Sequence, residues 1–478
     1  MLFLLVTSAA LAQQQVTPPP PGPPRQATIP QPVEKTLENG LRIIVVPKHN
    51  VPLVSARVLV KAGSEEDPGD LAGLAQMTAS LITKGTKTRS AEQIARGMEA
   101  LGATLNTSAG WDASQVNVTV MSPSFGKAME IVGDVVRNPS FRKDEIELVR
   151  RQSVDALEVV LQEPDSLADL VAARVVFGEA AYGHNVGGTP ETLGAIAREM
   201  IAAFHRAYYR PENSVLVVAG DVEPADVFST AEKTFGTWEK TPGVMGSVGK
   251  KPEERSSPPR VVVVDMPDAG QAAVVVTRRG LRRTDPLYYP ALVANSVLGG
   301  GYSARLNQEI RIKRGLSYGA YSSFDVRGEA GPFFASTQTK NESAAEVAGL
   351  IVDELNRLSR AELPETELTP RKAVLIGGFG RSLETSAGIV GRVSALALHG
   401  LPLEDINRYI GSVQAVDAAT VREFAKTHMG GGSASIVIVG DARQFVEKLR
   451  ERFGSVEVIP AAELDLNIAA LRKMKEAA

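Results

Sequence analysis

An arginine and a tyrosine seven positions apart are the residues of this chain best suited to stabilise charge on a carbonyl oxygen. Arg311 and Tyr318 lie in the segment EIRIKRGLSYGAY. A fixed guanidinium and a phenol donate hydrogen bonds to a developing oxyanion, and one such donor contributes about 3–4 kcal/mol where measured. Gly315 supplies a helix-to-strand turn that would bring the two side chains together. The spacing alone is a weak pattern, because a solvated helix arginine and a packed strand tyrosine would look the same.

Metal-ligating residues are scarce in this sequence. The chain has no cysteine, which excludes disulfide scaffolds, thiolate nucleophiles and cysteine-ligated metals. No two of its histidines lie within one helical turn, and none is paired with a glutamate in an H-x-x-E or E-x-x-H arrangement. Lone histidines are more often satisfied structural residues than ligands, and we expect this of His184 and His205. The five histidines are His49, His184, His205, His399 and His428.

Composition places the chain among ordinary globular proteins. It has 478 residues, enough for two or more domains. A net charge of −3 leaves no basic excess to neutralise phosphates, so we expect no nucleic-acid partner. No apolar run reaches the roughly 18–20 residues of a membrane-spanning helix, so we expect no membrane span.

The order of predicted elements repeats about 220 residues along the chain. The first half opens with a predicted strand over 41–48 and a second strand that ends at Gly63. The second half opens with predicted strands over 260–267 and 271–280. Gly63 and Gly280 lie 217 residues apart, and the aspartates that follow the closing strands, Asp221 and Asp441, lie 220 apart. Strands mixed with long helices in this order predict an α+β protein made of two homologous mixed α/β domains from an internal duplication.

Apolar periodicity and capping residues predict the helices between these strands. Ser90, with Gln93 three residues later, forms a capping-box signature. The residues beyond about 455 are expected to form a short amphipathic helix. The helices expected in the two halves cover 70–84, 90–102, 124–136, 142–161, 190–208, 287–298 and 343–358.

The N-terminus has the pattern of an export signal. Residues 1–12 are apolar and end in Ala10-Leu11-Ala12, a signal-peptide cleavage pattern, although a charged n-region is missing and a frayed apolar terminus is the alternative. Export without cysteine is typical of a periplasmic or otherwise exported bacterial protein. The expected organisation is a signal peptide (1–12), a Pro-rich linker (13–33), an N-terminal domain (34–248), a linker (249–259), a C-terminal domain (260–455) and a tail (456–478).

Four phrases together resemble the insulinase/pitrilysin-type zinc metallopeptidase family, in particular its short, processing-peptidase-like branch. The resemblance covers about residues 34–445 and implies two α+β domains that form half of a clamshell around a peptide chamber. The phrases are ENGLRIIVVPKHNVPLVSARVLVKAGSEEDP, GLAQMTASLITKGT, YYRPENSVLVVAGDV and LGGGYSARLNQEIRIKRGLSYGAYS.

The zinc motif of active relatives is degenerate here. They carry H-x-x-E-H on one helix, with two histidine ligands and a glutamate as general base. The matching positions are Gln76, Ala79 and Ser80, and the third ligand, a glutamate in relatives, falls at Ala156. None of these four residues can ligate zinc well or accept the proton, so we expect no metal and no cofactor in this chain.

The resemblance assigns a role to the retained pair. In active relatives an equivalent arginine and tyrosine contact the substrate carbonyl, and Arg311 and Tyr318 match them. The chain is therefore expected to be the zinc-less subunit of a heterodimeric peptidase, not an enzyme by itself. Its partner would be a zinc-bearing homologue, and its substrate a peptide or unfolded protein. The alternative is a non-enzymatic peptide-binding or scaffold protein of the same fold, and a self-sufficient peptidase with relocated ligands has no support in the sequence.

Two further segments have open interpretations. The glycines before Tyr302 fall where motif-less subunits of mitochondrial processing peptidase carry a glycine loop, but a turn is the favoured role. The strand after Asn106 lines the chamber in relatives, where a peptide adds to it by main-chain bonding. Asn106 and Trp111 are thus candidate substrate contacts, with a sheet-turn asparagine and a packed tryptophan equally probable.

Overall fold

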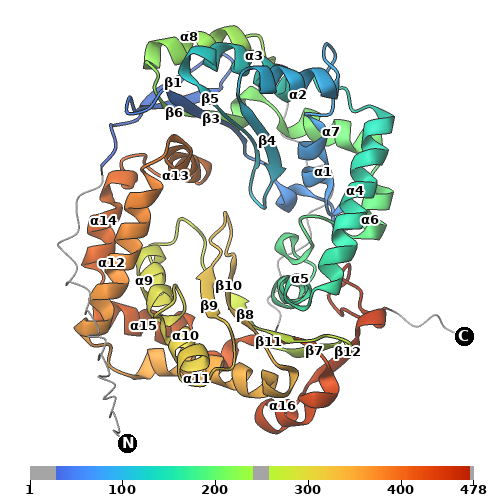
Figure 1. Ribbon diagram of the computed structural model, residues 1–478, viewed down its shortest axis with the longest axis vertical. Coiled ribbons are helices and arrows are strands. Elements are labelled where there is room, and N and C mark those ends of the chain that lie inside the picture. The colour runs from blue at the N-terminus through green and yellow to red at the C-terminus, as the bar shows by residue number, and fades with distance from the viewer. Residues whose placement is uncertain (1–27, 241–257, 474–478) are drawn as a thin grey trace, which may run out of the picture.

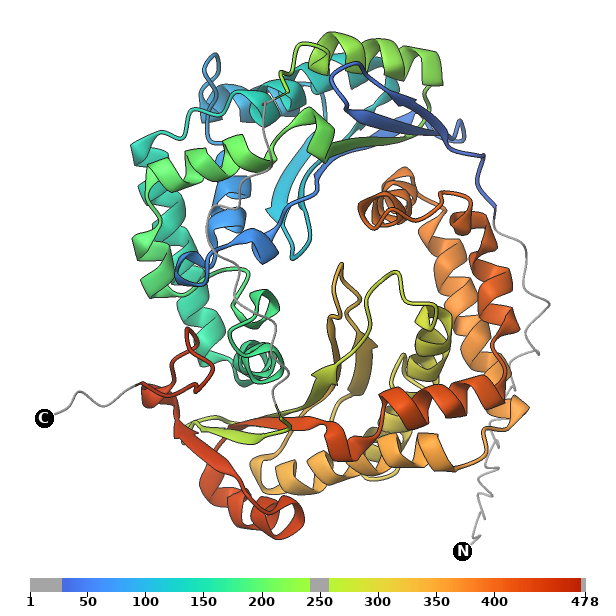
Figure 2. The same ribbon diagram turned by 180° about the vertical axis from the view of Figure 1, so that it is seen from behind.

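The computed structural model describes residues 28–240 and 258–473, and two six-stranded sheets organise them (Figures 1 and 2). The first sheet has the order β1-β2-β6-β3-β5-β4, and the second has the order β12-β7-β11-β8-β10-β9. The first sheet contains β1 (Val33–Thr36), β2 (Arg42–Pro47), β3 (Leu53–Val60), β4 (Thr104–Ala109), β5 (Ser114–Met121) and β6 (Ser214–Gly220). The second contains β7 (Val261–Asp265), β8 (Ala272–Arg279), β9 (Ala320–Phe324), β10 (Pro332–Thr339), β11 (Ser435–Gly440) and β12 (Glu457–Pro460).

The two sheets confirm the duplicated α+β architecture. Five strands occupy equivalent places in both sheets, and the parallel pair β2–β6 of the first sheet matches the parallel pair β7–β11 of the second, with an antiparallel strand, β3 or β8, next to it. The sixth strand differs, since β1 joins antiparallel from the N-terminal end and β12 joins parallel from the C-terminal end. The duplication predicted from the glycine and aspartate spacings is therefore visible strand by strand.

Sixteen α-helices are present in the described residues. Those of the first half are α1 (Leu74–Leu81), α2 (Ala91–Ala100), α3 (Phe125–Arg137), α4 (Lys143–Gln162), α5 (Pro164–Phe177), α6 (Pro190–Ala195), α7 (Arg198–Tyr208) and α8 (Pro224–Phe235). Those of the second half are α9 (Tyr288–Leu298), α10 (Arg305–Asn307), α11 (Ala344–Arg360), α12 (Glu365–Ser382), α13 (Ser386–Leu398), α14 (Asp405–Ala415), α15 (Ala418–His428) and α16 (Val446–Phe453).

The central strands of each sheet, β2, β3 and β6 in the first and β7, β8 and β11 in the second, are buried on both faces. Successive strand side chains point to opposite faces, so an unbroken apolar strand needs cover on both sides. In β2, Ile43 and Val45 pack in the core that holds α1, α2 and α3, while Ile44 and Val46 pack in a second core. Each sheet therefore requires two layers of helices.

The helix that covers the second face of each sheet comes from the other half of the chain. Helix α13 packs on β3 and β6, and α5 packs on β8 and β11 (Figure 1). Ile389 of α13 is fully buried against the first sheet, and Leu167 of α5 is buried against the second. This reciprocal exchange joins the halves through their hydrophobic cores.

The tips of two hairpins also meet between the halves. Asp112, in the β4–β5 turn, accepts hydrogen bonds from the Tyr182 hydroxyl (2.5 Å) and from the backbone N–H of Gly328 (2.8 Å). The buried Arg327 guanidinium lies over the rings of Trp111 (4.2 Å) and Tyr182 (4.7 Å). Trp111 is thus a packed residue at the junction, one of the two roles expected for it.

Several predicted helices have different limits in the structure. Helix α1 is shorter than 70–84 because Gly73 adopts φ 97° and Asp67 accepts the backbone N–H groups of Gly73 and Ala75 at the helix start. The helix expected over 190–208 is divided at Ile196 and Ala197, which have extended backbone. The Ser90–Gln93 capping box is confirmed.

The short helix expected beyond 455 is wrong for the described residues. Residues Glu457–Pro460 form β12, because Val458 and Ile459 pair with β7 and extend the second sheet. The end of the Pro-rich segment is also packed, since Ile29 is buried and hydrogen-bonds Asn407 in both directions. The signal peptide (1–12) and most of the two linkers lie outside the described residues.

We expect the reciprocal exchange to make the chain unfold as one unit. Leu167→Ala opens a cavity against the second sheet and should cost about 2–5 kcal/mol of unfolding free energy. Trp238 is buried in the core of the first sheet and Trp111 lies at the junction, so tryptophan fluorescence reports the unfolding of the first half and the loss of its contact with the second. In urea, fluorescence and circular dichroism should shift together to a lower midpoint.

Ile389→Ala, on the helix that the second half packs against the first sheet, should likewise lower the fluorescence and circular dichroism midpoints together. Val159→Ala, at a side chain 62% exposed, is the control and should change stability by less than about 0.5 kcal/mol. If Leu167→Ala instead produces two transitions with the fluorescence midpoint unchanged, the halves are not coupled in this way.

Candidate functional site

A hydrogen-bonded pair occupies the two positions at which relatives are expected to carry histidine ligands. On α1, the Gln76 amide donates to the Ser80 hydroxyl (Nε2–Oγ 3.3 Å). The Gln76 carbonyl oxygen accepts the backbone N–H of Ala109 (2.8 Å), which lies on the neighbouring edge strand β4. Gln76 therefore ties α1 to β4, and its oxygen already has a partner.

The other two positions of the degenerate motif carry only methyl groups. Ala79 is fully buried in the core of the first sheet, and Ala156 is exposed on α4. In residues 28–240 and 258–473, no three or more His, Asp or Glu side chains group as metal ligands would. The donor set at Gln76, Ala79, Ser80 and Ala156 does not fit zinc, whose sites use imidazole, thiolate and carboxylate.

The buried histidines have structural surroundings. His205 hydrogen-bonds the carbonyl of Val136 (2.8 Å), and burial lowers its pKa to about 4. His184 packs against Trp111 and lies 3.9 Å from the Asp67 carboxyl, and burial lowers its pKa to about 4 as well. Burial raises the pKa of Asp67 to about 8, against the lowering effect of its two backbone hydrogen bonds at the start of α1.

The segment that carries Arg311 leaves this guanidinium uncommitted. It lies in a π-helical turn over Gln308–Ile312, and Gly315 follows with φ 64°. Glu309 pairs with both Lys313 (2.7 Å) and Arg314. Within the described residues no hydrogen bond or ion pair engages the Arg311 side chain, and its guanidinium carbon lies 4.8 Å from the centroid of the Tyr302 ring.

Tyr318 projects from a backbone that is firmly held. The Thr337 hydroxyl donates to the carbonyl of Gly319 (2.6 Å), and the Thr339 hydroxyl donates to that of Leu316 (2.6 Å). The Tyr318 side chain is nonetheless 87% exposed. This combination presents the phenol to solvent with little freedom in the chain beneath it. The structure records no contact between Tyr318 and Arg311.

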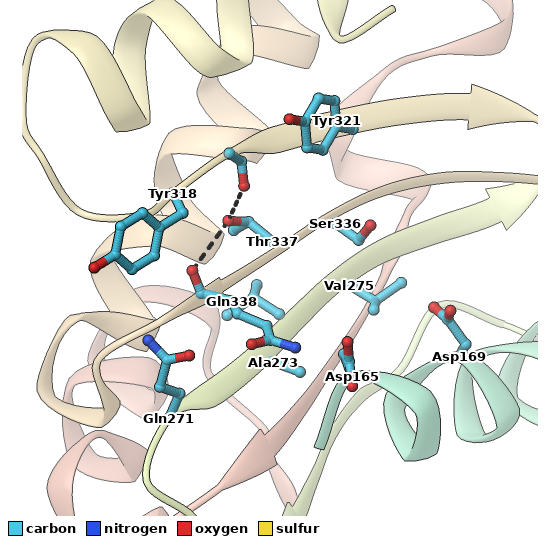
Figure 3. A pocket seen from close by; sticks show the side chains of 12 residues that line it. Asp165, Asp169, Gln271, Ala273, Val275, Tyr318, Tyr321, Ser336, Thr337 and Gln338 are labelled. Atoms are coloured by element: carbon cyan, nitrogen blue, oxygen red, sulfur yellow. Dashed lines mark hydrogen bonds between the residues drawn. The ribbon is translucent and has the colours of Figure 1, made fainter. Parts of the chain in front are cut away.

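A cavity of about 400 Å³ opens beside Tyr318. Figure 3 shows Tyr318 and Gln271 on one side and two carboxylates of α5, Asp165 and Asp169, on the other. The exchange of α5 between the halves therefore builds this site. Burial, with a smaller contribution from Asp165, raises the pKa of Asp169 to about 6. The polar and aromatic lining also includes Tyr321, Ser336 and Gln338.

Comparison with known proteins places the chain in a family. The model described as insulinase (peptidase family M16) matches residues 42–186, and the model described as the peptidase M16 inactive domain matches residues 195–375. This chain belongs to the insulinase family. An uncharacterized zinc protease of Mycobacterium tuberculosis is 28% identical over 427 residues, which cover 88% of this chain and 97% of that protein. A zinc protease of Bacillus subtilis is 25% identical and covers 82% of this chain and 94% of its own length.

Solved structures of the family share the fold. The crystal structure of a peptidase M16 inactive domain from Pseudomonas fluorescens superposes with a TM-score of 0.79 and 26% identity, covering 86% of this chain and 98% of that one. A Helicobacter pylori protease, 20% identical, has the same TM-score of 0.79 and covers 86% of this chain and 100% of its own. The two-domain insulinase-family fold expected from the sequence is confirmed.

Some residues of this insulinase-family site were not predicted. Asp165 and Asp169 lie one turn apart on α5, a helix that the periodicity analysis did not identify. The Pro164 start and the i, i+4 spacing of the two acids were the available signals. Asn106 is exposed on the edge strand β4, away from the cavity beside Tyr318. Its role as a substrate contact remains a prediction.

Replacing Gln76 tests whether its side chain stabilises the fold by joining α1 to β4. Gln76→Leu leaves the N–H of the buried Ala109 without its acceptor and should cost about 1–3 kcal/mol in urea unfolding. Ser80→Ala, which removes only the longer 3.3 Å bond, should cost less than about 1 kcal/mol. Equal, negligible losses in both variants would show that Gln76 does not hold β4 to α1.

The titration of Asp169, in the acidic wall of the cavity, can be measured. Because burial disfavours the charged carboxylate, Asp169 should titrate near pH 6 when followed by side-chain carboxyl NMR. Asp165→Asn removes a like charge and should lower this midpoint, while burial keeps it above the ordinary range. A wild-type midpoint near 4, the usual value for aspartate, would contradict the environment described for Asp169.

Proposed function

We propose that this chain is the zinc-less subunit of a two-chain zinc metallopeptidase. It pairs with a zinc-bearing homologue, closes the peptide chamber, and supplies Arg311 and Tyr318 to the partner's active site. The chain does not hydrolyse peptides by itself. The peptidase M16 family and the zinc-protease names of its relatives support the peptidase setting of this proposal.

The proposal rests on the contrast between two half-sites: the four zinc-motif positions, and the pair formed by Arg311 and Tyr318. At the zinc positions, the Gln76 side chain is hydrogen-bonded within the chain and Ala79 is buried. At the other half-site, Arg311 keeps its donors uncommitted and Tyr318 presents an exposed hydroxyl. A scaffold has no need of such a pair, whereas a substrate-binding subunit does.

The chemistry follows from these donors. Zinc in the partner would polarise the scissile carbonyl and activate water. From the opposite wall, the Tyr318 hydroxyl and the Arg311 guanidinium donate hydrogen bonds to the carbonyl oxygen as it gains negative charge. The charge on arginine is permanent and its planar fork suits an oxyanion, so Arg311 needs no proton transfer to act.

The substrates follow from the enclosure. A chamber closed by two chains admits peptides and unfolded segments and excludes folded proteins. The signal-like N-terminus and the lack of cysteine support a periplasmic or otherwise exported location. None of the helices in residues 28–240 and 258–473 combines the length and apolar character needed to cross a bilayer.

A mixing experiment tests the proposal. This chain and a zinc-motif homologue from the same genome are purified and assayed with a fluorogenic peptide, separately and together. Full activity is expected only in the mixture. Arg311→Ala or Tyr318→Phe should lower kcat of the mixture by roughly 10²–10³-fold, the loss typical of one oxyanion donor.

Lys313→Ala is the matched control, since it removes a cation from the same segment that Glu309 already neutralises. It should leave kcat unchanged. Full activity of the homologue alone, unaffected by adding this chain, would overturn the proposal and leave a peptide-binding or scaffold protein.

A further inference from the structure

The Tyr302 ring is the contact that restrains Arg311. The guanidinium carbon lies 4.8 Å from the ring centroid, within the range of a cation–π interaction. In the described part of the chain no carboxylate or carbonyl holds this side chain. Its neighbours differ, because Lys313 and Arg314 both pair with Glu309.

Tyr302 itself is anchored through its backbone. The buried Asn307 donates from Nδ2 to the carbonyl of Tyr302 (2.5 Å), and its Oδ1 accepts the N–H of Ala320 at the start of β9 (3.3 Å). The loop is also fastened at Gly299, whose carbonyl accepts the N–H of Ser322 (3.1 Å). A Cβ on Gly299 would lie 2.4 Å from that nitrogen, so the close approach requires glycine.

An aromatic face restrains a guanidinium without using its donors. Another arginine of this region shows the contrast: Arg305 is held by Glu367 through two hydrogen bonds of 2.7 and 2.8 Å, which occupy its fork. Stacking on a ring leaves the in-plane N–H groups of Arg311 available to an oxyanion. The 58% exposure of Tyr302 keeps the pair open to the solvent side.

We infer that Tyr302 is a positioning residue for Arg311, holding the guanidinium in place for the substrate carbonyl. The inference rests on the proposed function. It gives Tyr302 a role that the glycine-rich segment, expected only to turn the chain, did not have. Because Tyr302 acts through Arg311, loss of the Tyr302 ring should reduce the fraction of time that the Arg311 guanidinium spends in its productive pose. Substrate binding should be little affected.

Three substitutions at Tyr302 separate the ring from its surroundings, assayed in the mixture with the zinc-bearing homologue. Tyr302→Leu removes the π face and should lower kcat about two- to fivefold, with KM little changed, as expected for an exposed cation–π contact. Tyr302→Phe keeps the face and should retain kcat within about twofold. Tyr302→Glu introduces a carboxylate that occupies the Arg311 donors and should be worse than Tyr302→Leu.

Two controls make the effect specific to Arg311. In the Arg311→Ala background, Tyr302→Leu should cause no further loss, since the residue it positions is gone. Tyr288→Leu makes the same change at a different pair, where Arg283 lies 3.8 Å from the ring centroid, and should leave kcat unchanged.

A measurement without the partner keeps this inference distinct from the proposed function. The Arg311 Nε–H resonance should show an upfield ring-current shift that disappears in Tyr302→Leu and persists in Tyr302→Phe. If the shift is absent, or if Tyr302→Phe is as impaired as Tyr302→Leu, the inference is overturned. If Arg311→Ala leaves the mixture fully active, the proposed function fails whatever the NMR result.

Discussion

The structure depends on the need of each sheet for cover on both faces. Strands such as β2 are apolar on both sides, and the half that contains a sheet supplies helices for only one of its faces. The other face is buried by a helix from the opposite half, α13 on the first sheet and α5 on the second. Neither half can therefore bury its own sheet completely. The relative position of the halves is therefore fixed by the packing of their hydrophobic cores.

This exchange also builds the candidate site. Helix α5 brings two carboxylates against the second sheet, beside strands β8 and β10. The hydroxyls of Thr337 and Thr339 hold the turn that carries Tyr318. Residues as far apart in the chain as Asp165 and Gln338 thus line one cavity, and Tyr318 lies beside it on a backbone that hydrogen bonds hold.

The two half-sites inherited by this insulinase-family chain have diverged in a physically consistent way. Where ligands would be, Gln76 and Ser80 satisfy each other and Ala79 fills core space, so the fold gains stability from positions that no longer suit metal. Where substrate contacts would be, the Arg311 guanidinium lies over the Tyr302 ring, and within the described residues no hydrogen bond or ion pair occupies its donors. Under the proposed function, the first half-site contributes only to stability, while the second keeps the donors that the chemistry requires.

The sequence predicted those features that depend on residues close together in the chain. Strand β2, the Ser90–Gln93 capping box and the Gly315 turn follow from residues adjacent in the chain. The resemblance to the family, through the phrase that contains Gln76, Ala79 and Ser80, located the positions where active relatives carry zinc ligands. Helix α5 was missed because its apolar residues pack on β8, about 100 residues further along the chain, and on β11, about 270 residues further along, which local periodicity cannot reveal.

Long-range pairing also accounts for the remaining differences between the predicted and the observed structure. The tail has charged and apolar residues that suit a helix, but pairing with β7 makes Glu457–Pro460 a strand. The contact of Gln76 with Ala109 and that of Tyr302 with Arg311 each join segments that only the folded chain brings together. Such contacts leave no mark in a single sequence.

The composite site is tested most directly by the proximity of Tyr318 to the partner's metal. The chain would carry 3-fluorotyrosine at position 318, with the zinc-bearing homologue loaded with cobalt in place of zinc. On mixing, paramagnetic broadening or a large shift of the position-318 fluorine signal is predicted, with no change when the homologue is loaded with diamagnetic zinc. A fluorine signal unaffected by cobalt in a complex shown to have formed would contradict the account.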